Sequence, residues 1–290
     1  MIHGCATALV TPFDEKGELD EEGLRKLVTF QEENGVDYIV PCGTTGESAT
    51  LSHTEHLKVI SIVIDQAKKA KVIAGAGSNS TSEAVHLSKG AKDLGAYAIL
   101  SISPYYNKPT QKGIVKHYET IAKSVEIPIV VYNVPGRTGS NINPPTVAQL
   151  AKIPNIVGIK EASGNIGQIM SILSQAPKDF SVISGDDALT FPMMAMGGKG
   201  VISVASNVAP KFVSSMVHHA LKGMWEDARI EHFKLLPLFN NLFIETNPIP
   251  VKTALRLMGK PSGSFRLPLC DMEPGSLEVL KKTLAELNLI

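Results

Sequence analysis

The sequence has no excess of charge of either sign. Lysine and arginine together number 28, and so do aspartate and glutamate, in a chain of 290 residues. A balanced charge provides no long-range attraction to nucleic acid or to an anionic membrane surface. We therefore expect neither as a partner.

Cysteine is also scarce, with only Cys5, Cys42 and Cys270 in the whole sequence. An odd number of widely spaced cysteines does not suggest a disulfide framework and is typical of a reducing compartment. No run of about 18 uncharged apolar residues is present, so no membrane span is expected. The first residues lack a basic segment followed by an apolar one, so no secretory signal is predicted. Together these absences favour a cytoplasmic protein.

What the sequence does contain is a regular alternation of short apolar runs with longer amphipathic stretches. The runs lie at residues 4–10, 36–41, 71–76, 96–102, 127–132, 155–160, 180–184 and 200–204. Helical patterns lie at 21–34, 52–70, 81–94, 111–125, 144–152, 166–176, 188–196 and 210–222. Apolar strands that each precede a helix indicate a parallel sheet covered on both faces. Eight such units predict a (β/α)8 TIM barrel.

A doubly wound open sheet is the competing fold, but no complete G-x-G-x-x-G pattern follows the first run. From residue 224 onward the pattern changes to helices without strands, at 226–243, 251–258 and 276–289. Proline-rich turns at 247–250 and 261–263 separate these helices. We therefore predict a barrel over residues 1–223, carrying the active site, and a C-terminal helical extension over 224–290.

Lys160 ends the apolar run at 155–160 and is its only cationic residue. An amine held among apolar neighbours loses hydration, which disfavours its charged form and lowers its pKa. This is the usual preparation of a lysine that forms a Schiff base with a carbonyl compound. A surface lysine just past the end of a strand is the alternative.

Tyr132 ends the preceding predicted strand. Side chains alternate along a strand, so Lys160 shares a face with Gly158, which we expect to leave room for the amine. If both strand ends face the barrel interior, Tyr132 and Lys160 lie on strands about 5 Å apart. A phenol beside the amine can move the protons that Schiff-base formation requires.

Further polar side chains follow other strands, where the active sites of such barrels are found. Thr44 and Thr45 follow the second strand, and Arg137 follows the fifth. Arginine suits a substrate carboxylate because its guanidinium binds two oxygens at once. The set predicts Schiff-base chemistry on a 2-oxo acid. The alternatives are threonines that bond to local backbone and an arginine that lies on the surface.

Three tempting patterns do not support another function. Residues 75–77 form an incomplete glycine motif, typical of a turn rather than a dinucleotide site. Asp186 and Asp187 have no histidine partner nearby for a metal, and a helix N-terminus favours carboxylates in any case. The glycine-rich stretch 197–200 precedes a strand, which places it at the opposite face of the barrel.

Taken together, these residues resemble the dihydrodipicolinate synthase family of pyruvate-dependent class I aldolases. The resemblance covers essentially the whole chain, and its motifs lie at residues 43–47, 104–107, 132–138, 158–163, 184–186, 200–203 and 247–252.

The resemblance implies that Lys160 condenses with pyruvate and that the resulting enamine attacks L-aspartate 4-semialdehyde. Tyr132, Thr44 and Tyr106 would relay protons, with Tyr106 contributed by a neighbouring subunit. It implies no metal and no cofactor, and an assembly that is usually a homotetramer, a dimer of dimers.

The family also implies which residues bind the substrates. Thr45 would hold the pyruvate carboxylate and Arg137 the carboxylate of the semialdehyde, while the backbones of Gly185 and Ile202 would shape the pocket. Sibling lyases of sugar acids share Lys160 and Tyr132 but generally differ at the two threonines and the arginine, so we favour the synthase. A sugar-acid lyase and a non-catalytic sensor of oxo acids are the alternatives.

A second site is suggested near the start of the helix at 52–70. His53 and His56 are three residues apart and so share a helix face. Two exposed histidines would be the simplest interpretation. The family resemblance instead implies a site for L-lysine as feedback inhibitor, formed by Ser48, Ala49, His53, His56, Asn79, Glu83 and Tyr105. Tyr105, next to Tyr106, could equally serve as packing at a subunit contact.

Overall fold

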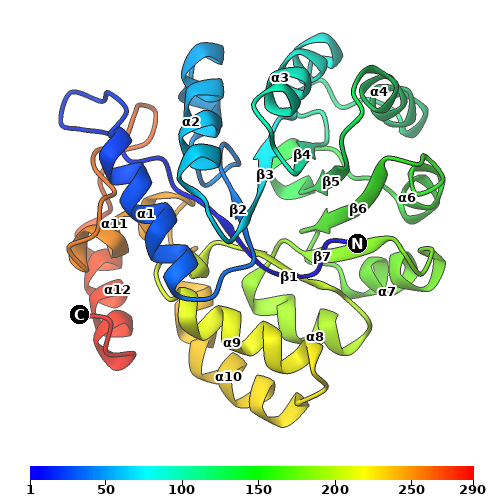
Figure 1. Cartoon of the computed structure of the whole chain (residues 1–290). Coiled ribbons are helices and arrows are strands. Elements are labelled where there is room, and N and C mark those ends of the chain that lie inside the picture. Colours follow the sequence, from blue (N-terminus) through cyan, green and yellow to red (C-terminus); the bar gives the residue numbers. More distant parts are fainter.

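The computed structural model describes residues 1–290 and contains a closed barrel of eight parallel strands in chain order. Figure 1 shows the barrel surrounded by its helices. The strands are β1 Gly4–Ala8, β2 Tyr38–Val40, β3 Lys71–Gly75, β4 Ala98–Ile102, β5 Ile129–Asn133, β6 Ile156–Glu161, β7 Ser181–Ser184 and β8 Gly200–Ser203. Because β8 pairs with β1 and leaves no free edge, the TIM barrel is confirmed and the open sheet was the wrong alternative.

The helices around the barrel follow the predicted order. They are α1 Glu21–Glu33, α2 His53–Gln66, α3 Thr81–Asp93, α4 Gln111–Ser124, α6 Pro144–Leu150, α7 Ile166–Gln175, α8 Thr190–Ala195 and α9 Pro210–Leu221. The sequence pattern missed the one-turn helix α5 Pro135–Thr138, whose four residues are too few to show a periodicity. It also began α8 too early, because Asp187–Leu189 form a separate 3-10 turn, η2.

Local sequence sets where several helices begin. Ser52 caps α2 by accepting a hydrogen bond from the Glu55 backbone, while the Glu55 side chain accepts one from the Ser52 backbone. Asp20 caps α1 through the Gly23 backbone. Each cap satisfies a backbone N–H that has no partner within the helix. These caps fix where the helices start relative to the strand ends.

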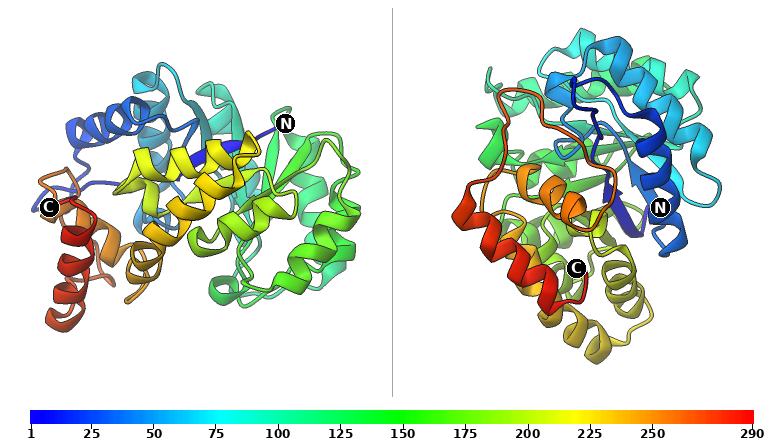
Figure 2. Two further views of the ribbon diagram at one scale, coloured as in Figure 1. Left: turned by 90° about the horizontal axis from the view of Figure 1, so that it is seen from below. Right: turned by 90° about the vertical axis from the view of Figure 1, so that its left-hand side faces the viewer.

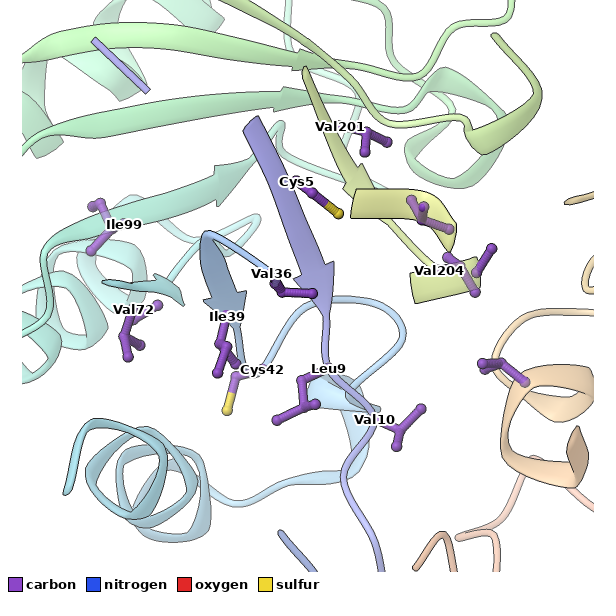
Figure 3. Packing of buried hydrophobic residues seen from close by; sticks show 14 of the residues in the cluster. Cys5, Leu9, Val10, Val36, Ile39, Cys42, Val72, Ile99, Val201 and Val204 are labelled. Atoms are coloured by element: carbon purple, nitrogen blue, oxygen red, sulfur yellow. The ribbon is translucent and has the colours of Figure 1, made fainter. Parts of the chain in front are cut away.

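The apolar side chains divide into two cores, as the alternation of strand residues requires. A cluster of 13 buried residues fills the barrel interior and includes Val130, Tyr132 and Ile202. A cluster of 65 buried residues lies between the strands and the helices. Figure 3 shows part of this outer cluster, including Ile39, Val72 and Ile99 on successive strands. Tyr132 therefore faces the inside of the barrel.

The last three helices are α10 Trp225–Asn241, α11 Ile249–Leu257 and α12 Pro274–Glu286. Figure 2 shows α12 at the outer edge of the molecule, beside α11. Helix α11 is not peripheral, because every residue from Ile249 to Leu255 is buried. Side chains from α10, α11 and α12 belong to the same hydrophobic cluster as the barrel helices. The division of the chain after residue 223 stays a prediction. None of the helices combines the length and the apolarity needed to cross a membrane.

Candidate active site

Lys160 lies near the end of β6, directly opposite Tyr132 of β5 and Ile183 of β7. Its ammonium nitrogen is 4.4 Å from the centre of the Tyr132 ring. Both side chains are buried, with exposed fractions of 5% and 6%. The prediction that the Lys160 amine lies beside the Tyr132 phenol is confirmed. The alternative of a surface position for Lys160 was wrong.

Burial lowers the pKa of Lys160 to about 8, with a smaller upward effect of Asp187 and a further downward effect of Arg137. Desolvation disfavours the ammonium form because the barrel interior cannot replace the water around a charge. A neutral amine has a free electron pair. Lys160 is therefore prepared to attack a carbonyl carbon near neutral pH.

The space around Lys160 depends on Gly185, not on Gly158. A methyl group at Gly185 would lie 2.9 Å from Cε and 3.0 Å from Cγ of Lys160, which is too close for carbon atoms. A methyl group at Gly158 would instead meet the carbonyl oxygen of Ser181 at 2.5 Å. The expectation that Gly158 leaves room for the amine was therefore wrong, since Gly158 admits the backbone of β7.

Tyr132 and Thr44 line one wall of a cavity of about 440 Å³ at the carboxyl ends of the strands. Burial raises the pKa of the Tyr132 phenol, while the charge of Arg137 and the hydroxyl of Thr44 act in the opposite direction. The phenol thus stays protonated near neutral pH and has Thr44 as its neighbour. The Lys160 amine lies over the ring of this phenol, and a protonated phenol with a hydroxyl neighbour can take part in proton transfer.

The two residues expected to hold carboxylates are both tied to Asn247, which precedes α11. The Thr45 hydroxyl accepts a hydrogen bond from the Asn247 amide at 3.0 Å. The Arg137 guanidinium donates to the Asn247 carbonyl at 3.1 Å. Arg137 is exposed and lines the cavity, whereas Thr45 is buried behind it. Sequence reasoning did not identify Asn247, because its link to the site exists only in the folded chain.

The remaining candidates lie in different surroundings. Ile202 is buried in the barrel interior and, like Gly185, does not line the cavity. Tyr106 has 89% of its surface exposed and a left-handed backbone, with φ of 71°. It does not line the cavity of its own chain, whereas its neighbour Tyr105 does.

The second cluster of candidates lines the same cavity, with Ser48, Ala49, His53, His56, Glu83 and Tyr105 among its walls. The Glu83 carboxylate pairs with His53 and accepts a hydrogen bond from Ser78. His56 is buried and bonds the Gly75 carbonyl at 2.7 Å, so the picture of two exposed histidines was wrong for this one.

Asn79 is not part of the cavity wall. Its amide donates to the carbonyl of Tyr105, and its own carbonyl accepts from Asn107. Asn79 thus holds the loop that carries both tyrosines.

Asp187 is a buried carboxylate whose part in the site sequence reasoning missed. It accepts hydrogen bonds from the Ser203 hydroxyl at 2.5 Å and from the backbones of Val204 and Ala205 at 2.9 and 3.0 Å. These donors fix the carboxylate just beyond the end of β7. From there its negative charge raises the pKa of Lys160. The available signal was its position two residues after Gly185, at a strand end.

One further side chain that could react, the Cys42 thiol, is made unreactive by its surroundings. The Cys42 thiol is buried and faces the His56 carbonyl of α2 at 3.4 Å. Figure 3 shows its side chain within the outer hydrophobic cluster. Burial raises its pKa far above the usual range, so it stays a protonated, unreactive thiol. No three His, Cys, Asp or Glu side chains lie close enough together to hold a metal ion.

Comparison with known proteins assigns the chain from residue 1 to residue 287 to the dihydrodipicolinate synthetase family. A 4-hydroxy-tetrahydrodipicolinate synthase of Syntrophus aciditrophicus is 55% identical over 291 residues, covering all of both chains. The chloride-inhibited dihydrodipicolinate synthase of Acinetobacter baumannii, solved in complex with pyruvate, is 44% identical with a TM-score of 0.98 over 100% of both chains. The enzyme of Cyanidioschyzon merolae, solved with lysine bound, is 43% identical with a TM-score of 0.96 over 99% of both chains.

Proposed function

The chain belongs to the dihydrodipicolinate synthetase family, and we propose that it condenses pyruvate with L-aspartate 4-semialdehyde through a Schiff base on Lys160. The observation that identifies Lys160 as the Schiff-base residue is the burial of its amine. Lys160 combines a pKa of about 8 with a register position opposite Tyr132. The names of its close relatives support the synthase rather than a sugar-acid lyase.

In the proposed reaction the neutral amine of Lys160 adds to the keto carbon of pyruvate. Water leaves and a protonated imine forms, whose positive charge accepts the electron pair of a C–H bond at the methyl carbon. Loss of that proton gives an enamine, which attacks the aldehyde carbon of the semialdehyde. The amino group of the second substrate then attacks the imine carbon, closes the ring and releases Lys160. Since the imine is the electron sink, the proposal requires no cofactor.

We assign the proton transfers to Tyr132 and Thr44, since the phenol lies against the amine and has the threonine hydroxyl as neighbour. Tyr106 would complete the relay from a second subunit. Its exposure and its absence from the cavity wall of its own chain support a role in another copy. This is the reason to propose an oligomer, and we propose the homotetramer expected of the family.

We assign the substrate carboxylates to Thr45 and Arg137, which Asn247 holds in fixed positions. The arginine is the only one of these groups that carries charge, and its place at the cavity wall suits an anionic second substrate. Gly185 would admit the substrate carbons beside Lys160, and Ile202 would close the barrel beneath them. The location we propose is the cytoplasm, which agrees with three cysteines that are all free.

The experiment that tests the assignment is reduction with borohydride in the presence of pyruvate, followed by mapping of peptide masses. We expect an adduct on Lys160 in the wild type and none in the Lys160→Arg variant. Lys199→Arg is the matched control and should label normally, because Lys199 lies at the opposite end of the barrel, just before β8. An unlabelled Lys160 in the folded wild type would overturn the proposal. Turnover with aspartate semialdehyde, compared with sugar-acid aldehydes, then tests the second substrate.

We further propose that L-lysine inhibits the enzyme at the wall formed by Ser48, Ala49, His53, His56, Glu83 and Tyr105, with Asn79 behind it. Glu83 supplies a carboxylate for an ammonium group, and the loop held by Asn79 supplies Tyr105. Calorimetric titration with L-lysine should give a binding signal in the wild type that the Glu83→Gln variant lacks. Full activity in millimolar lysine together with a flat titration would contradict this part.

A further inference from the structure

An ion pair lies buried behind the threonine loop. The Lys252 ammonium of α11 is 2.6 Å from a carboxylate oxygen of Glu47, and both side chains are entirely excluded from solvent. Glu47 ends the loop that carries Thr44 and Thr45, residues 43–47. The pair therefore connects the C-terminal extension with the loop to which we assign proton transfer and carboxylate binding.

The ammonium of Lys252 joins several segments of the chain. It also donates to the Ser264 carbonyl at 2.7 Å and lies 4.7 Å from the Phe13 ring centre and 5.1 Å from that of Phe265. Phe13 follows β1, Glu47 follows β2, and the other contacts come from the extension. One buried charge thus fixes two of the loops at the carboxyl ends of the strands.

The threonine loop needs such support, because its backbone is held in an unfavourable conformation at both ends. Cys42 has φ of 56° and Glu47 has φ of 53°, in the left-handed region that residues other than glycine rarely adopt. Two further contacts restrain the loop. The Thr11 hydroxyl donates to the Gly46 carbonyl at 2.7 Å, and Asn247 bonds Thr45.

The pair is poorly arranged for stability alone. The second carboxylate oxygen of Glu47 is buried and has no hydrogen-bond partner. Buried ion pairs are often no more stabilising than apolar side chains of similar volume, so an incompletely bonded one argues for another purpose. Its position suggests what that purpose is.

We propose that Lys252 and Glu47 are positioning residues, through which α11 holds the threonine loop in the conformation that places Thr44 beside Tyr132 and Thr45 beside the substrate. This inference rests on the proposed function of the two threonines. According to this inference, the C-terminal extension contributes to the active site by positioning the threonine loop, although the extension supplies neither the amine nor the phenol.

The test compares the double variant Glu47→Gln/Lys252→Met with wild type. The double variant removes both charges at nearly constant volume, so neither is left buried without a partner. Lys281→Met is the matched control, since it removes a cation of the extension whose partner Glu278 is exposed on α12. We measure pyruvate KM and kcat, melting, and hydrogen exchange of the amides of residues 43–51.

We expect the double variant to fold, to exchange the loop amides faster, and to raise the pyruvate KM by about tenfold or more, since misplacement by about 1 Å can cost on the order of 100-fold. The control should match wild type in all three. A folded double variant with wild-type KM, kcat and loop exchange would overturn the inference. If the double variant does not fold, Glu47→Gln alone, which keeps the shape and an acceptor for Lys252, is judged by the same readouts.

The inference and the proposed function fail in different ways. Absence of a pyruvate adduct on Lys160 of the wild type contradicts the proposed function whatever the loop does. Normal labelling of Lys160, with an unchanged loop in the folded variant, contradicts only the positioning role.

Discussion

The pKa of Lys160 leads to a prediction about the pH dependence of Schiff-base formation. Burial lowers this pKa to about 8, whereas that of a free lysine is about 10.4. At pH 7 about one amine in ten is then neutral, compared with about one in 2,500 for an unperturbed lysine. The difference corresponds to about 3 kcal/mol and to a gain of about 200-fold in reactive amine.

The assay is the initial rate of borohydride-trapped pyruvate adduct on Lys160 between pH 6 and pH 10. We expect the rate to rise about tenfold per pH unit at low pH and to level off near pH 8, because only the neutral amine reacts. Two variants should move the inflection in opposite directions. Arg137→Met removes a cation that lowers the pKa of Lys160, so the inflection moves to higher pH. Asp187→Asn removes an anion that raises it, so the inflection moves to lower pH.

A wild-type inflection at about pH 10 would refute the reasoning, because the amine would then behave as an exposed lysine. Shifts of both variants in the same direction would refute the assignment of the two charges. A surface residue provides the control: Lys281→Met, whose lysine pairs with Glu278 at the exposed face of α12, should leave the profile unchanged.

Three further predictions concern other parts of the molecule. Gly185→Ala should reduce adduct formation on Lys160 by about 100-fold, since the added methyl would overlap Cε and Cγ of Lys160 and the Cβ of Ala162, so that the lysine must shift; adduct formation at the wild-type rate would contradict this prediction. Alkylation of the native protein should modify the exposed Cys270 and spare Cys5 and Cys42 until unfolding, because both are buried with raised pKa values; rapid modification of either would count against this. His218 has a raised pKa owing to its hydrogen bond with Asp37. Its contribution to stability should be complete below about pH 6.5 and lost as the pH rises through the folded-state pKa. His218→Asn should therefore reduce the difference in unfolding free energy between pH 6 and pH 8, measured with urea, and an unchanged difference would contradict the pairing.

The sequence predicted the strands well because each is a short apolar run. It predicted that Lys160 and Gly158 share a strand face because side chains alternate along a strand. The same rule could not say what lies beside each glycine. Gly158 and Gly185 are both near Lys160 in sequence or in space, but only the packing of β7 against β6 shows that Gly185 faces the amine. The one-turn helix α5 was missed for a different reason, since a single turn has no period to detect.

The sequence by itself determined the fold class, the position of Tyr132 and Lys160 at the ends of successive strands, and the residue types at the strand ends. The register that sets Tyr132 opposite Lys160 came from the pairing of β5 with β6 in the closed barrel. Periodicity and side-chain chemistry are local properties, and they can be read along the chain. Only the tertiary structure brought Asp187 within reach of Lys160, tied Thr45 and Arg137 to Asn247, and placed Lys252 against Glu47. These contacts join residues up to 205 positions apart. No local pattern encodes them, because their partners are selected by how the closed barrel and its C-terminal helices pack.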